Sequence, residues 1–300
     1  MRRALFALAA LPLLAAAAPR LLAAAPLSPQ AQWQADIAGQ NFAYARKPHA
    51  MLKIQDSVYL GEGESAVLAG TKGVAASWKW TGKPGAKGLL RLSLKGGKLT
   101  VTKDGKPIEA KRINTGVSVD AGVDIAGQPT QVGAGVNGWR IFVYNQKNPE
   151  ALNFKGVSYF PYDPAFRLTA RFVPDGKLPP RVFKTSRGTD KQFFHAGDAV
   201  FTLKGKNVRL PFYTDSRDPK QVKDMSAFFH DEITGNGAYG AGRYVDVADF
   251  GAFPPRQVVI DFNEAYNPNC ARSAHFTCPL AVDEIPVAMR AGERDPHIKH

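Results

Sequence analysis

Glycine and proline divide this chain into many short segments, and this division limits the folds that it can adopt. The 300 residues include 28 Gly and 22 Pro, and the runs between them are rich in β-branched and aromatic residues. In the run AFRLTARFV (165–173), Phe166, Leu168 and Phe172 share one face, and polar residues occupy the other. Short alternating strands with frequent turn residues predict an all-β fold.

A segment rich in Pro, Asn and Tyr (145–166) separates two blocks of such strands. We therefore expect two packed antiparallel β-domains. The first is a β-sandwich at residues 50–150, and the second is a β-sandwich or barrel at residues 151–294 that carries the most distinctive motifs. One helix is expected near residues 31–44, inside an N-terminal helical segment of residues 26–49. Residues 295–300 are expected to form a disordered tail.

The N-terminus has the layout of a secretory signal peptide. Arg2 and Arg3 precede an apolar stretch at residues 4–18, and small residues follow it. The stretch is short, rich in Ala and interrupted by Pro12, unlike a permanent membrane anchor. The sequence predicts a signal peptide of residues 1–25, with cleavage after Ala25, and a secreted or periplasmic chain that is not bound to a membrane.

The formal net charge is +13, but lysine and arginine are scattered among the predicted strands with no dense basic run. Export also separates the chain from nucleic acid, which we exclude as a partner. The partners that remain are a small molecule or an anionic polymer of the cell envelope.

Cys270 and Cys278, with His275 between them, are the only cysteines. A zinc site would need a fourth ligand and closer spacing, so we expect neither a metal nor a cofactor. Export into an oxidising compartment favours a disulfide between them. Two free thiols, with a redox or ligand role, are the alternative.

Five stretches in the second block resemble a bacterial family known only as a domain of unknown function, the DUF sixteen-eighty-four family. They are NFKGVSYFPYDPAFRLTARF, TGNGAYGAGRYVDV, DFNEAYNPNCA, CPL and IPVAMRAGE, and they span residues 153–293. The resemblance implies no established activity. Where family members commonly have Lys-Glu-Thr, this chain has Asn236, Gly237 and Ala238; if that glutamate serves chemistry, this chain has lost it.

The first block looks like a forkhead-associated-type β-sandwich. The resemblance rests on LGEGESAVLAG, KLTVTKDGKPI and GWRIFVYN. The residues with which such modules hold phosphothreonine have no match here, so the resemblance implies the sandwich and not phosphopeptide binding.

A glycine-rich turn before an arginine suggests where a ligand could bind. Backbone N–H groups of such a turn, together with a guanidinium, can hold an anionic group. Alternation along RQVVIDF places Asp261 and Asn263 on the face opposite its apolar residues. We therefore predict a pocket for a small or extended polar ligand, anionic ligands included, formed by Tyr239, Gly240, Gly242, Arg243, Asp261, Asn263, Tyr266 and Asn267.

Two alternatives to a ligand site stay open. In the first, Arg243 pairs with Asp261 or Asp246 and only organises the fold, as in a structural or interaction module. In the second, the protein is a hydrolase that uses two carboxylates. The candidate acids are Asp231, Glu232, Asp246, Asp261 and Glu284, and spacing does not select a pair. No serine-hydrolase elbow or zinc-protease motif is present, so the sequence leaves open whether the protein is an enzyme.

Overall fold

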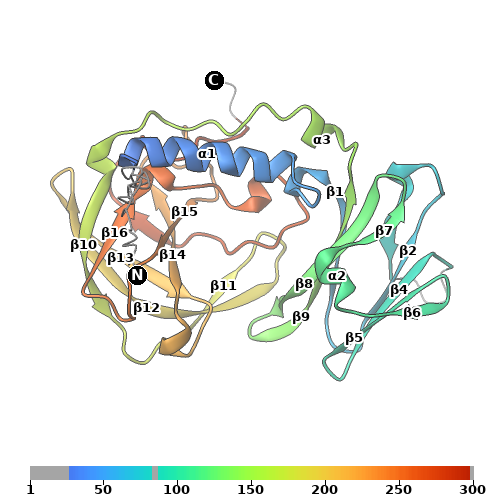
Figure 1. Cartoon of the computed structure of the whole chain (residues 1–300). Helices are drawn as coiled ribbons and strands as arrows, with labels where there is room; N and C mark the ends of the chain where they lie inside the picture. The colour runs from blue at the N-terminus through green and yellow to red at the C-terminus, as the bar shows by residue number, and fades with distance from the viewer. Residues whose placement is uncertain (1–26, 83–86, 298–300) are drawn as a thin grey trace, which may run out of the picture.

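A computed structural model describes residues 27–82 and 87–297. The predicted signal peptide and residues 298–300 lie outside this part of the chain. The described part is mostly β and forms three sheets with one long helix, α1 (Figure 1). None of its helices is both long enough and apolar enough to cross a membrane.

Two antiparallel sheets make up the first half of the chain. The four-stranded sheet has the order β1 (Ile54–Leu60), β9 (Val136–Asn145), β8 (Val123–Gly133), β7 (Val117–Asp120). The five-stranded sheet has the order β3 (Lys79–Thr81), β2 (Ser65–Ala69), β4 (Leu90–Lys95), β5 (Lys98–Lys103), β6 (Lys106–Ile108).

The sequences KGGK and KDGK form the tight hairpins expected of them. Gly96 and Gly97 have φ of 58° and 70°, and Asp104 and Gly105 have φ of 49° and 75°. Two consecutive positive φ angles match the twist of the flanking strands. The apolar faces of both sheets then share one core, which includes Leu68, Leu92, Ile125 and Ile141.

The second half forms one eight-stranded sheet. Its main path is β15 (Arg243–Ala248), β14 (Asp224–Asp231), β13 (Lys206–Thr214), β12 (Asp190–Leu203), β10 (Arg167–Pro174), β16 (Gln257–Asp261). β11 (Pro180–Lys184) pairs with β12, and β17 (Asp283–Ile285) runs parallel to β14.

This sheet curls into a nearly closed, barrel-like form (Figure 1). Its two ends approach where Tyr244 of β15 and Tyr266, just beyond β16, exchange two backbone hydrogen bonds of 2.9 Å. The interior is filled by a separate core that includes Phe166, Phe172 and Phe229. The alternation predicted for residues 165–173 is confirmed at Phe166 and Phe172, which are buried, while Leu168 is half-buried.

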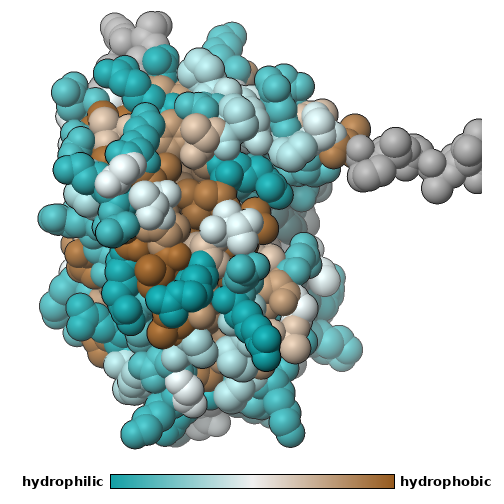
Figure 2. Space-filling view, turned by 90° about the vertical axis from the view of Figure 1, so that its left-hand side faces the viewer, coloured by the Kyte–Doolittle hydropathy of each residue, from teal (hydrophilic) through white to brown (hydrophobic). Residues whose placement is uncertain are grey.

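The outer surface near β10 and β16 is mixed in character. Figure 2 shows apolar side chains reaching the surface among polar ones on this side of the molecule. Val259 of β16 contributes an exposed apolar side chain, because it points away from the face on which Val258 and Ile260 are buried.

The helix α1 (Pro29–Ala45) confirms the helix predicted near residues 31–44 and lies across one end of the second half (Figure 1). The hydroxyl of Ser28 caps its N-terminus by accepting from the Ala31 N–H at 3.2 Å. The Trp33 indole donates to the Asn263 carbonyl at 2.8 Å, and Asn41 Oδ1 accepts from the Val157 N–H at 2.8 Å. α1 therefore packs on the block that carries the family motifs.

The remaining helices are single turns. They are η1 (Met51–Lys53), η2 (Ala75–Ser77), α2 (Arg112–Thr115), α3 (Pro149–Leu152), η3 (Pro164–Phe166), η4 (Pro219–Gln221), η5 (Phe262–Glu264) and η6 (Asn269–Ala271).

The first residues of the predicted disordered tail are ordered. The Asp295 N–H donates to the Gly237 carbonyl at 3.0 Å, and Asp295 is buried. The polar sequence RDPHIKH suggested a disordered tail. The contact that orders Asp295 is made with a loop almost sixty residues earlier in the chain, so the local sequence could not predict it.

Candidate functional site

Arg243, the centre of the pocket predicted from sequence, is sealed inside the second half. Its side chain is fully buried, and Nη2 donates to Asp231 Oδ2 at 2.5 Å and to the Met289 carbonyl at 3.1 Å. Nη1 donates to the carbonyls of Ala291 and Glu293. The expected ion pair exists, but its acid is Asp231 and not Asp261 or Asp246. A guanidinium enclosed in this way presents no surface to a ligand.

The glycine-rich turn serves packing at one position. Gly242 has φ of 86°, and a Cβ there would lie 2.4 Å from the Ala281 Cβ and 2.7 Å from the Phe229 carbonyl oxygen. The residue must therefore be glycine because the chain passes so close to its neighbours. Gly240 is exposed, and half-buried Tyr239 lies against the His297 ring at 5.9 Å between centroids.

Asp261 and Asn263 are buried, whereas strand alternation placed them on an open face. After β16 the chain enters η5, so its side chains no longer alternate between two faces. Asp261 Oδ1 accepts from the Asn263 N–H at 2.9 Å and from Asn263 Nδ2 at 2.8 Å. Asn263 also exchanges two hydrogen bonds of 2.9 Å with the backbone of Asp163. This network joins two chain segments.

The two remaining residues of the predicted pocket, Tyr266 and Asn267, donate to other acids. The Tyr266 hydroxyl donates to Asp246 Oδ2 at 2.9 Å. Asn267 is fully buried and donates to the carboxylate of Glu293, from its backbone N–H at 2.8 Å and from Nδ2 at 3.0 Å. Asn267 and Arg243 are therefore linked through Glu293, whereas the Asp261–Asn263 and Tyr266–Asp246 contacts are separate from them.

Cys270 and Cys278 are free thiols, which corrects the predicted disulfide in favour of the alternative. The η6 turn brings them together without a bond between them: the Cys270 N–H donates to Cys278 Sγ at 3.4 Å. Among the described residues, no three His, Cys, Asp or Glu side chains form a group that could hold a metal ion.

A cavity of about 400 Å³ lies where the start of the first half meets the end of the second. Its apolar wall comes from Leu52, Phe154, Ala271 and Pro296. Its polar groups come from Glu150, Ser158, Arg272, Asp295 and His297. We call it the Arg272 cavity.

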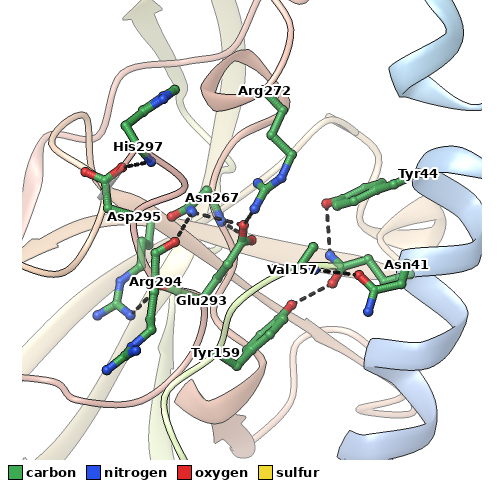
Figure 3. Close-up of polar contacts among 12 residues, drawn as sticks. Asn41, Tyr44, Val157, Tyr159, Asn267, Arg272, Glu293, Arg294, Asp295 and His297 are labelled. Atoms are coloured by element: carbon green, nitrogen blue, oxygen red, sulfur yellow. Dashed lines mark hydrogen bonds and ion pairs between the residues drawn. The ribbon is translucent and has the colours of Figure 1, made fainter. Parts of the chain in front are cut away.

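Arg272 is the one arginine among the residues that line this cavity, and its side chain is 8 % exposed. It forms an ion pair with Glu293 and lies over the ring of Tyr44, 5.6 Å from its centroid (Figure 3). Within the described structure, its Nη1 is buried and has no hydrogen-bond partner. Burial raises the pKa of the Glu293 carboxyl, and the Arg272 charge opposes this shift.

Tyr44 and Tyr159 lie near this ion pair, and both form hydrogen bonds with one glutamine of α1 (Figure 3). Gln40 Nε2 donates to the Tyr44 hydroxyl at 2.9 Å, and the Tyr159 hydroxyl donates to Gln40 Oε1 at 2.6 Å. Burial, assisted by the negative charge of Glu293, raises the pKa of Tyr44 to about 12 and that of Tyr159 further. Both phenols are therefore neutral at neutral pH, and they suit hydrogen bonding better than proton abstraction.

Three of the acids proposed for a hydrolase line a second cavity, of about 320 Å³. His230, Asp231, Glu232 and Glu284 surround it, because the pairing of β14 with β17 sets His230 opposite Glu284. Asp231 is already committed to Arg243.

Sequence reasoning missed Arg272 and Glu293. Glu293 ends the motif IPVAMRAGE, and Arg272 lies between the cysteines, so both fell inside stretches already singled out. Their contact joins residues that are 21 positions apart, and no local pattern predicts it.

Comparison with known proteins agrees with the resemblance of the second block. No curated protein matches the chain. An uncharacterized protein of Haloarcula marismortui, solved by NMR, is 29 % identical; the match covers 48 % of this chain and 79 % of that chain, with a TM-score of 0.41. The forkhead-associated-type likeness of the first block stays a prediction. Residues 152–294 match the model of the family described as "Protein of unknown function (DUF1684)".

Proposed function

We propose that this protein is an exported binding protein for a small ligand that has one anionic group and an apolar part. Export is supported by the signal-peptide layout of residues 1–25. The separate cores of the two halves support their assignment as two domains, a sandwich followed by a barrel. The single observation that carries the binding proposal is the buried, unpartnered Nη1 of Arg272 beside a cavity.

An unpartnered buried N–H group is costly, and a group that accepts from it recovers that cost. A carboxylate oxygen suits it, because guanidinium and carboxylate form strong charge-assisted hydrogen bonds. Glu293 holds Arg272 from the other side, so the guanidinium is positioned before a ligand arrives. Arg272 thus takes the part that the sequence suggested for Arg243.

The rest of the cavity sets the chemistry of the ligand. A volume of about 400 Å³ lies within the range of small-molecule sites. Leu52 and Phe154 form part of its apolar wall, which favours an aliphatic or aromatic body. Asp295 and Glu150 also line it and repel a second negative charge. We therefore favour monocarboxylates over polyanions such as envelope polymers.

The first experiment measures thermal stability with matched pairs of ligands. Octanoate and benzoate are the probes, and octanol and benzyl alcohol are their uncharged controls. A ligand at roughly 100 times its Kd stabilises the fold by about 2.7 kcal/mol. We expect at least one carboxylate to raise Tm by several degrees while its alcohol does not. Equal shifts for acid and alcohol would contradict the proposal.

The variant Arg272→Lys tests the anchor. Lysine keeps a positive charge beside Glu293 but lacks the second nitrogen of the guanidinium fork, so the carboxylate-induced shift should fall while the ligand-free Tm changes little. Arg167→Lys is the matched control, since Arg167 also pairs with a buried acid, Asp261, but does not line the cavity. A shift retained in Arg272→Lys would rule out this site.

The cavity around His230 and Glu284 favours a second candidate, a hydrolase. The histidine and the free acids there could act as a proton acceptor and donor pair. Chromogenic glycoside and ester panels test it. Turnover that is lost in Glu284→Gln would support this candidate, and no turnover on either panel would remove it.

A further inference from the structure

The two cysteines differ in their access to solvent although they are adjacent. Cys278 is 7 % exposed, whereas Cys270, in η6, is half-buried and within reach of a small molecule. The Cys270 N–H donates to Cys278 Sγ at 3.4 Å, which holds the two residues side by side. A more accessible sulfur beside a buried one suits thiol–disulfide exchange, because the accessible sulfur can attack a partner and the buried one can resolve the product.

Polar groups around the pair favour a thiolate at Cys270. The Ser186 hydroxyl, from the turn between β11 and β12, accepts from the Cys278 N–H at 3.2 Å. Its one proton can go to the Phe276 carbonyl at 3.3 Å or to the sulfur of Cys270. Hydrogen bonding from Cys278, and also from Ser186, lowers the pKa of Cys270 to about 6. Because Cys278 is the donor, its own pKa is raised.

Other ionisable groups also face the pair. Lys191 of β12, whose Nζ donates to the Thr277 carbonyl at 3.0 Å, lies near Cys278, and burial lowers the pKa of its ammonium group. Tyr239, Tyr244 and Tyr266 also face the cysteines, and burial raises the pKa of each phenol. His275 lies in the intervening loop, but its ring contacts Ser57 Oγ at 3.2 Å, on the first half.

We propose that Cys270 and Cys278 are a redox-active dithiol that exchanges with low-molecular-weight disulfides, with Cys270 as the attacking thiol and Cys278 as the resolving thiol. The half-buried position of Cys270 limits the partner to a slim disulfide. This activity is independent of ligand binding in the Arg272 cavity.

The exchange proceeds in two balanced steps. The Cys270 thiolate attacks one sulfur of the partner disulfide, forms a mixed disulfide and releases one thiolate, which takes a proton from water. Cys278 then loses its proton to water and attacks the sulfur of Cys270, and the second partner thiolate leaves. Two electrons pass from the cysteine pair to the partner, which becomes two thiols, while a Cys270–Cys278 disulfide forms. The reverse reaction reduces this bridge.

A purely structural disulfide is the competing account. A bridge closed once during export would have two inert sulfurs, and neither a difference in exposure nor a depressed pKa would be needed. The distinction is kinetic: an exchanging pair opens and closes with glutathione, and a structural bridge resists it.

The experiment treats the reduced mature protein with oxidised glutathione and follows it by intact-mass spectrometry. The wild-type chain should lose the mass of two hydrogen atoms, as its two thiols are oxidised to a disulfide, and retain no glutathione. Cys278→Ser should retain one glutathione on Cys270, and Cys270→Ser should react much more slowly because its remaining thiol is buried. Cys278→Ala serves in place of Cys278→Ser if that variant does not fold, as judged by circular dichroism.

The dependence of rate on pH identifies the attacking thiol. In Cys278→Ser the rate should reach half its maximum near pH 6 if the serine hydroxyl replaces the thiol as donor. At that pH Cys270 should react roughly tenfold faster than N-acetylcysteine, since its larger thiolate fraction outweighs its weaker nucleophilicity. Ser186→Ala should move the midpoint to higher pH. Equal rates for the two single-cysteine variants, glutathione retained on the wild-type chain, or a bridge that millimolar glutathione does not open would each overturn the proposal.

Discussion

The buried pair of Arg243 and Asp231 joins three segments of the second half. Arg243 begins β15 and Asp231 ends β14. The guanidinium also donates to the carbonyls of Met289, Ala291 and Glu293. A buried ion pair with this many hydrogen bonds is strongly interdependent, because loss of one member leaves the other charge uncompensated.

We expect Arg243→Ala to lower the free energy of unfolding by about 3–5 kcal/mol. Arg167→Ala, which removes a half-exposed arginine from the Asp261 pair, should cost about 1 kcal/mol or less. Urea unfolding followed by circular dichroism measures both. If the two variants lose similar stability, Arg243 does not have the structural role that its contacts imply.

At the scale of elements, α1 contacts the second half through residues that recur every three or four positions. Trp33, Gln40, Asn41 and Tyr44 lie on one helical face, and that face meets Asn263, Tyr159 and Arg272. The helix therefore completes the wall behind the Glu293 pair, although it precedes the whole sheet in the chain.

We predict that Trp33→Ala destabilises the protein by about 1–3 kcal/mol, since it removes a half-buried indole from Tyr159 and Tyr162 at 6.0 and 5.5 Å between ring centroids. Phe42→Ala, on the same helix but 56 % exposed, should change stability by about 0.5 kcal/mol or less. Denaturant titrations of both variants measure the change in the free energy of unfolding. A larger change for Phe42→Ala than for Trp33→Ala would mean that the helix packs on the second half by its other face.

Local pattern predicted some of these elements and could not predict the site. The helix at residues 29–45 and the alternating strand at residues 165–173 could be predicted, because the pattern that indicates each of them lies within a few residues. The predicted partner of Arg243 was wrong because several acids were available and tertiary packing selected among them. Asp261 was placed on an open face because strand alternation does not show that the η5 turn brings Asn263 back onto its carboxylate. The contact between Arg272 and Glu293 is a tertiary one, which no local pattern indicates.

At the scale of the whole molecule, the loop of residues 271–277 connects the two halves. The Tyr59 hydroxyl donates to the His275 carbonyl at 2.9 Å, and Phe276 packs on Phe142 at 5.1 Å between centroids. Gln131 and Gln192 add a reciprocal pair of hydrogen bonds, of 2.8 and 2.9 Å, between β8 and β12. Each half has its own core, and a third buried apolar cluster, which includes Phe142 and Phe276, packs across this boundary.

Protonation of His275 should weaken that boundary. Burial lowers the pKa of His275 below its usual 6.5, so the folded state favours the neutral ring. The unfolded chain binds the proton more readily, and stability therefore falls as pH drops from about 6.5 through the folded pKa. Measured between pH 7 and 5, the decline in Tm should be smaller in His275→Asn than in the wild type. An identical decline would show that His275 does not contribute.

The same loop holds Arg272 near one end and the aromatic contact of Phe276 near the other, and the two cysteines flank it. An inserted or deleted residue there would displace the proposed ligand anchor, the contacts between the halves and the cysteine pair together. These three features are therefore expected to change in step among related chains, and a protein engineer could not retune one of them by altering the length of this loop without disturbing the other two.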